Sequence, residues 1–220
     1  MKPTIKIDFV SDIACPWCAV GYGNLALSMA SMRDQADFLV HYRAFQLNPQ
    51  MPLGGQDAME HLTQKYGLSL TQVQSNQAQI RVRAKEAGFD FHPEGRKRVY
   101  NTFQCHRLLY WVAHEIGLAQ QASLKKELLN TYFCLALSID DVKNILDAVS
   151  RAGLDIKRAQ EIISSYEFTE EVKAEENFYK NLGIHSVPSM IVNDQYLLQG
   201  AQDHHSLTRS FQKILKEASS

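Results

Sequence analysis

The sequence Cys15-Pro16-Trp17-Cys18 constrains this chain more than any other feature. It follows residues 4–10, whose alternating apolar and polar side chains predict a strand, and it begins a predicted helix over about residues 16–32. At such a junction, the unpaired backbone N–H groups and the dipole of the helix favour a thiolate over a thiol. Proline also suits the first helical position, because its missing N–H would be unpaired there. The motif therefore predicts a reactive cysteine, Cys15, within reach of a second thiol.

Three other interpretations of the two thiols are weaker. The remaining cysteines, Cys105 and Cys134, form no second pair with the spacing of metal ligands, so a zinc site is not expected. Haem attachment would require histidine where Ala19 stands. A purely structural disulfide across so short a loop would restrict little chain entropy. The motif thus favours dithiol redox chemistry, and we expect no metal site.

The composition limits the classes of protein that remain. The 220 residues are 45% hydrophobic, which suffices for one substantial core or for one domain with a large insertion. The formal net charge of −1 provides no basic surplus for nucleic acid. No apolar signal region follows Met1, and no stretch approaches the ~18 apolar residues of a membrane span. We therefore expect a cytoplasmic protein without a nucleic-acid or membrane partner.

The predicted elements run strand–helix–strand, then a block of helices, then strand–strand–helix. A second strand is predicted over residues 37–45, and helical spacing of apolar residues from about 57 to 182 predicts six or seven helices. Strand signals return at 189–192 and 196–198 around a short turn signal, before a closing helix over about 203–216. Neither end alone supplies enough strands for a stable sheet. We expect one sheet built from both ends, with the helices inserted between.

A proline stands directly before the third predicted strand, in Val187-Pro188-Ser189. By itself it would indicate only the first position of an edge strand. Together with the dithiol motif it favours a cis Val187-Pro188 bond, which would present a backbone edge beside Cys15.

With these motifs in place, the chain resembles the DsbA family of thioredoxin-like disulfide oxidoreductases, and within it the FrnE-like branch. That branch is related to 2-hydroxychromene-2-carboxylate isomerase and kappa-class glutathione transferase. The resemblance implies an α/β fold, a DsbA-like thioredoxin fold with a large all-helical insertion. Residues 1–54 and 166–220 would form the thioredoxin-like domain, and 55–165 the helical insertion domain. The matching stretches are residues 12–21, 42–49, 101–108, 186–188 and 200–202.

The resemblance also implies the roles of the site residues. Cys15 would be the attacking and Cys18 the resolving cysteine, and Trp17, Val187 and Pro188 would bind the substrate. The implied activity is thiol–disulfide exchange through a mixed disulfide with a protein or with glutathione, without a bound cofactor. Related isomerases and transferases usually carry serine at the first motif position, so the cysteine in this sequence favours a redox activity. A glutathione-dependent isomerase or transferase, with glutathione as co-substrate, and a non-catalytic redox-sensing module remain as alternatives.

Several residues outside the motif have two interpretations. We expect Cys105 and Cys134 to pack in the core, because free cysteine is often buried, while His106 could face the active groove. Asp140 and Asp155 are expected helix N-caps. The glutamates of 167–176 are expected to be exposed. Seven basic residues of the middle region are expected to form a solvated helix face rather than a site for an anionic substrate such as glutathione. They are Arg81, Arg83, Lys85, Arg96, Lys97, Arg98 and Arg107.

Overall fold

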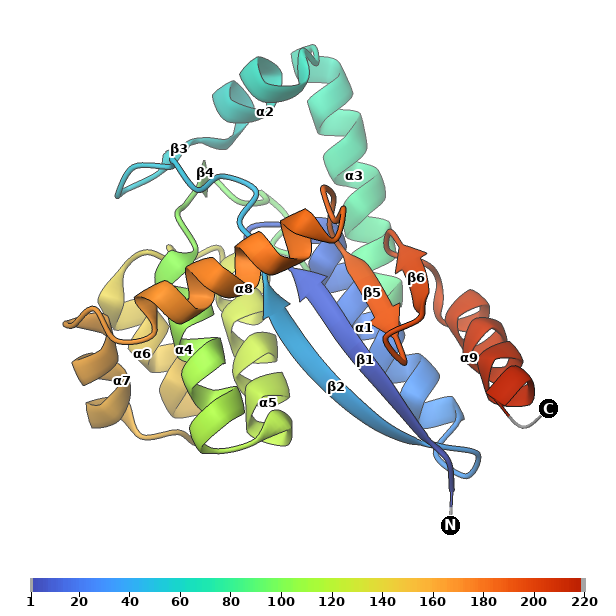
Figure 1. The fold of residues 1–220 in the computed structure, drawn as a ribbon. Helices are drawn as coiled ribbons and strands as arrows, with labels where there is room; N and C mark the ends of the chain where they lie inside the picture. Colours follow the sequence, from blue (N-terminus) through green and yellow to red (C-terminus); the bar gives the residue numbers. More distant parts are fainter. Residues whose placement is uncertain (1, 219–220) are drawn as a thin grey trace.

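The two ends of the chain form one sheet, as expected. The computed structural model describes residues 2–218. The sheet has the order β2-β1-β5-β6, in which β1 runs parallel to β2 and antiparallel to β5, and β6 runs antiparallel to β5 (Figure 1). The predicted elements are confirmed, with ends that differ by no more than two residues. They are β1 (Thr4–Ser11), α1 (Pro16–Ser31), β2 (Asp37–Ala44), β5 (Ser189–Val192), β6 (Tyr196–Gln199) and α9 (His204–Ala218).

The middle of the chain is helical, again as expected. Within its described residues it contains seven α-helices, a π-helical segment and two short strands that the sequence did not predict. The short strands β3 and β4 pair antiparallel to each other. The domain boundaries at residues 54 and 165 stay a prediction. The elements are β3 (Gln56–Asp57), α2 (Ala58–Tyr66), α3 (Leu70–Glu86), β4 (Arg98–Val99), α4 (Phe103–Glu115), α5 (Leu118–Leu129), η1 (Asn130–Cys134), α6 (Val142–Arg151), α7 (Ile156–Ile163) and α8 (Thr169–Asn181).

Helices cover both faces of the sheet. On one face, the side chains of β1 pack against α1 and α9 in a buried apolar cluster that includes Ile7, Leu25 and Phe211. On the other face, Val10 packs against Tyr179 of α8. Because successive side chains of a strand point to opposite faces, one strand serves both layers. No helix within residues 2–218 has the length and apolar character needed to cross a membrane.

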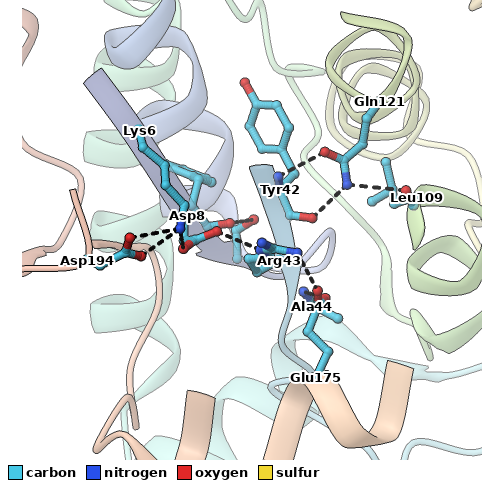
Figure 2. A network of polar contacts seen from close by, with 11 residues as sticks. Lys6, Asp8, Tyr42, Arg43, Ala44, Leu109, Gln121, Glu175 and Asp194 are labelled. Carbon is cyan, nitrogen blue, oxygen red and sulfur yellow. Dashed lines mark hydrogen bonds and ion pairs between the residues drawn. The ribbon is translucent and has the colours of Figure 1, made fainter. Parts of the chain in front are cut away.

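The edge strand β2 is covered by α5 of the middle region and by α8. Gln121 of α5 accepts a hydrogen bond from the Tyr42 backbone N–H (3.0 Å) and donates one to the Tyr42 carbonyl (2.8 Å). Glu175 of α8 accepts from the Ala44 N–H (2.8 Å) and pairs with Arg43 (3.0 Å), as Figure 2 shows. An open sheet edge presents unpaired backbone groups, and these side chains satisfy three of them: the N–H and carbonyl of Tyr42 and the N–H of Ala44. Helices α5 and α8 are thereby fixed beside the carboxyl-terminal half of β2.

The structure corrects two expectations about acidic residues. Glu175 is held against β2, and Glu176 is only 5% exposed, so the stretch at 167–176 is not wholly solvated. The N-cap of α6 is Asp141 rather than Asp140, which instead accepts a hydrogen bond from the loop before β3. Asp155 caps α7 as expected.

Candidate active site

The motif lies where β1 ends and α1 begins. Cys15 is the N-cap residue of α1 with an extended backbone (φ −91°, ψ 114°), and Pro16 opens the helix. The Cys18 N–H donates to the Cys15 carbonyl at 3.0 Å, which closes the first turn. Both thiols are free. The local sequence therefore determines the helix start and brings the two cysteines onto one turn.

The loop before β5 meets Cys15 from the other end of the chain. The Val187-Pro188 bond is cis, as predicted, and the Cys15 Sγ lies 3.7 Å from the Val187 carbonyl oxygen. The expected juxtaposition is confirmed. Cys15 is largely enclosed, with only 4% of the residue accessible, and Cys18 is fully buried. The Val187 carbonyl lies against the Cys15 sulfur, and a cavity opens beside it.

The two thiols are chemically inequivalent. A hydrogen bond with the Cys18 side chain holds the pKa of Cys15 below its ordinary value, against the effect of burial, and the positive charge of Arg96 contributes to this. The pKa of Cys18 is raised well above its ordinary value, first by burial and then by its interaction with Cys15. The thiolate is the nucleophile in thiol–disulfide exchange. This asymmetry supports attack by Cys15.

A buried carboxylate supports the motif from behind. Asp12 accepts hydrogen bonds from the backbone N–H groups of Ala14 (3.1 Å) and Leu47 (2.7 Å), and the His106 Nε2 lies 3.4 Å from its Oδ1. Burial raises the pKa of Asp12, but the hydrogen bonds of His106 and Leu47 outweigh it, and the net pKa is lowered. His106 therefore faces Asp12 rather than the groove. Sequence reasoning assigned no role to Asp12, although it opens the matching stretch 12–21 and stands between a strand and the motif.

Replacing Asp12 with asparagine is expected to lower the pKa of Cys15 further, because the negative charge of Asp12 raises it. The variant should also lose about 1–3 kcal/mol of stability, since an amide cannot accept both backbone hydrogen bonds in the same way. The rate of Cys15 alkylation against pH and a urea titration measure the two effects. Asp37→Asn, at an exposed position of β2, is the control; an unchanged or raised pKa of Cys15 in Asp12→Asn would contradict the electrostatic argument.

A cavity of about 870 Å³ opens over the motif. Its lining includes Cys15, Trp17 and Val187, and the opposite wall is built by α2, α3 and the loop before β4. Pro188 is buried and is not part of the lining. It packs on α1 at Gly21, where an added Cβ would lie 3.1 Å from the proline Cγ. The structure thus brings all five sequence-predicted site residues together, with Cys18 and Pro188 behind the cavity surface.

The seven basic residues do not share one solvated face, contrary to expectation. Arg81 and Arg96 line the cavity. Arg107 is 2% exposed and donates to the carbonyls of Glu167 (2.7 Å) and Ile162 (2.6 Å), which ties α4 to the chain around α7. The others are exposed as expected: Arg83, Lys85, Lys97 and Arg98. The periodicity of apolar residues in a helix does not predict which side of the α2–α3 hairpin faces the motif.

The other two cysteines differ from the motif and from each other. Cys105 is fully buried on α4, as expected, and burial raises its pKa to about 12. Cys134 ends the π-helical segment and packs against the core as expected, but it is only half-buried, at the edge of the core. Desolvation raises its pKa to about 11. Thiols with raised pKa are poor nucleophiles at neutral pH. Within residues 2–218 there is also no cluster of three or more potential metal-ligating side chains.

Replacing Cys105 with alanine is expected to preserve the reactivity of the motif and to lower the free energy of unfolding by about 1–2 kcal/mol, because it leaves a small void in a closed core. Thermal or urea unfolding measures the loss, and alkylation of Cys15 measures the reactivity. Loss of disulfide exchange in a folded variant would instead assign a redox role to Cys105.

This fold and site define a class of protein: a thioredoxin-type sheet with a Cys-Pro-Trp-Cys helix start, a cis-proline loop beside it and a helical insertion. A model of the DSBA-like thioredoxin domain matches residues 6–212, and the chain belongs to this family. A search of curated proteins found no match.

Solved structures show the same architecture. A probable DsbA oxidoreductase from Streptomyces coelicolor superposes with a TM-score of 0.87 at 26% identity, over 97% of this chain and 91% of that one. A 2-hydroxychromene-2-carboxylate isomerase gives 0.72 at 15% identity, over 97% and 98% of the two chains. The cytosolic disulfide reductase DsbM from Pseudomonas aeruginosa, solved with GSH, gives 0.62 at 13%, over 96% and 99%. These neighbours agree with the FrnE-like branch of the family.

Proposed function

We propose that this protein is a thiol–disulfide oxidoreductase that works through Cys15 and Cys18. The observation that supports this most is the inequivalence of the two thiols. Cys15 lines the cavity and has a lowered pKa, whereas Cys18 is fully buried behind it and has a raised pKa. One thiol is thus ready to attack a substrate, and the other is protected from it and adjacent to the first.

In the reductive direction, the Cys15 thiolate attacks one sulfur of a substrate disulfide. A mixed disulfide forms, and one substrate thiolate leaves. Cys18 then attacks the Cys15 sulfur as its proton passes to solvent or to the departing thiolate, which releases the second substrate thiol. Two electrons pass from the protein dithiol to the substrate, and the reverse sequence oxidises a dithiol. No bound cofactor is required.

The surrounding residues have supporting roles in this proposal. Trp17 is 39% exposed and Val187 lies beside the attacking sulfur, so both would contact the substrate. Pro188 would support Val187 from behind. The backbone before β5 offers polar groups to an extended substrate. We place the activity in the cytoplasm, where thiols are kept reduced.

A second candidate is a glutathione-dependent isomerase or transferase. The large cavity favours it, since about 870 Å³ exceeds what a single disulfide bond requires. The neighbouring isomerase and the DsbM structure solved with GSH make glutathione the co-substrate to test. In that case, Cys15 would stand beside a glutathione thiol instead of attacking a protein disulfide.

The experiment is disulfide reduction by the purified protein, with dithiothreitol or with glutathione as the electron source. We expect turnover of a small disulfide with either reductant. Glutathione binding without disulfide turnover would favour the isomerase or transferase. Absence of both would overturn the enzymatic proposal and leave a redox-sensing module.

A further inference from the structure

The wall of the active-site cavity has a one-sided charge. Three cationic side chains, Lys65, Arg81 and Arg96, belong to its lining, and the lining contains no aspartate or glutamate. Within residues 2–218, none of the three forms an ion pair with a carboxylate of the protein, although other lysine and arginine side chains form fifteen such pairs. Cations in a partly enclosed apolar cavity attract anions more strongly than cations on an open surface.

Arg96 is the cation most closely joined to the motif. Its Nη1 donates to the carbonyl oxygen of Ala14, the residue before Cys15. Its guanidinium carbon lies 5.7 Å from the ring centre of Tyr132 and 5.8 Å from that of Phe133, within cation–π distance. The planar group is therefore held in place by this hydrogen bond and the two ring contacts. A guanidinium has five N–H donors, so others remain for a ligand in the cavity.

Lys65 and Arg81 extend this charge along the α2–α3 wall. The Lys65 ammonium group donates to the Leu47 carbonyl (2.8 Å) and to Asn48 Oδ1 (2.7 Å), both of them neutral acceptors. Arg81 lies on α3, half-buried and without an ion pair in the described structure. Two residues on, Arg83 is exposed and pairs with Glu86 at 3.1 Å. The cation that faces the cavity is unpaired, and the one that faces solvent is paired.

We propose that the substrate of Cys15 is a small disulfide that carries carboxylates, bound through Arg96 with Lys65 and Arg81. This rests on the proposed function. A cavity of about 870 Å³ is within the range of small-molecule sites. Carboxylates form short, bidentate hydrogen bonds with arginine, and these bonds fix orientation as well as adding affinity. Held in this way, the disulfide presents one sulfur to the Cys15 thiolate. A bond between that sulfur and Cys15 forms, the substrate S–S bond breaks, and a carboxylate-bearing thiolate leaves.

The test is a single-turnover reaction of the reduced protein with three disulfides of different charge. They are 3,3′-dithiodipropionate (anionic), 2-hydroxyethyl disulfide (neutral) and cystamine (cationic). Each rate constant is divided by that of a free small thiol with the same disulfide, which removes intrinsic reactivity. We expect the normalised rate for the anion to exceed that for the cation by about tenfold or more, and the ratio to fall as salt is added.

Matched variants locate the effect. Arg81→Gln and Lys65→Gln should each reduce the anion-to-cation ratio several-fold, whereas Arg83→Gln, with the same charge change on the same helix, should leave it unchanged. Arg96→Gln should reduce it most and also raise the pKa of Cys15, which the pH dependence of alkylation measures. Circular dichroism checks that each variant is folded.

The outcomes are separable from failure of the proposed function. If none of the three disulfides oxidises the motif, the oxidoreductase proposal itself fails. If all three react with equal normalised rates, or if Arg83→Gln changes the ratio as much as Arg81→Gln, the anionic site is overturned while the oxidoreductase remains. A higher normalised rate for cystamine than for the anionic disulfide would also overturn the anionic site.

Discussion

Replacement of Cys15 with serine is expected to reduce disulfide turnover to the background rate, whereas Cys18→Ser should trap one mixed disulfide per chain through Cys15. The difference follows from the lowered pKa of Cys15 and its place at the cavity, against the fully buried Cys18. The first variant lacks the nucleophile, and the second lacks only the thiol that releases the product. Mass spectrometry under non-reducing conditions identifies the adduct.

Cys105→Ser is the control, because that thiol is also fully buried but lies outside the motif. It should neither abolish turnover nor accumulate an adduct. Equal residual activity in the Cys15 and Cys18 variants, or an adduct on a cysteine other than Cys15, would refute the assignment of attacking and resolving thiols.

Replacement of Lys125 with methionine is expected to stabilise the protein by about 1–3 kcal/mol. Lys125 of α5 is fully buried, and its Nζ has no hydrogen-bond partner in the described structure. Burial lowers its pKa, which the charges of Cys18, Asp12, Cys105 and Cys15 oppose. Methionine keeps the apolar stem and removes a buried ammonium group that has no hydrogen-bond partner in the described structure. A urea titration of the reduced protein measures the gain.

The same variant should slow the reaction of the Cys15–Cys18 dithiol. The Lys125 charge lowers the pKa of Cys18, so its removal should raise that pKa further and slow resolution of the mixed disulfide. Greater stability with slower resolution would show that this buried charge is retained for reactivity at a cost in stability. Lys126→Met, one residue along at an exposed position, is the control and should change neither quantity.

The stabilisation should depend on pH in a defined direction. The pKa of Lys125 is lowered from 10.5 in the folded chain, so between the lowered value and 10.5 the unfolded chain binds more protons. Stability of the wild type therefore rises with pH across this window. The advantage of Lys125→Met should be largest below the window and shrink as pH approaches 10.5. A constant or growing advantage would contradict this.

The predictable parts of the fold are those that depend on neighbours in the sequence. The alternation of β1, the proline at the start of α1 and the turn between β5 and β6 each act within a few residues, so their elements agree with the structure to within two residues. The motif cysteines were identified for the same reason. The prediction of one sheet from both ends followed because a two-strand fragment is not stable alone.

Local patterns could not show how the helices of the middle region face the sheet. Helical periodicity marks an apolar face but not the element it packs against, so Arg81 and Arg96 were expected on a solvated face. Asp12 and His106 meet across 94 positions, and no spacing rule relates them. The cavity itself needs α2, α3, the motif and the Val187 loop at once.

Lys125 and Lys126 show where the sequence by itself stops determining this protein. As a sequence they are two identical neighbours in a helix, but the structure buries the first completely and exposes the second. Lys125 lies one helical turn after Gln121, on the side of α5 that packs against β2 and α4. The sequence alone determined the Cys-Pro-Trp-Cys helix start and the order of the elements, because those follow from local chemistry. Tertiary packing alone decided which charges surround the motif, because burial depends on elements distant in the chain.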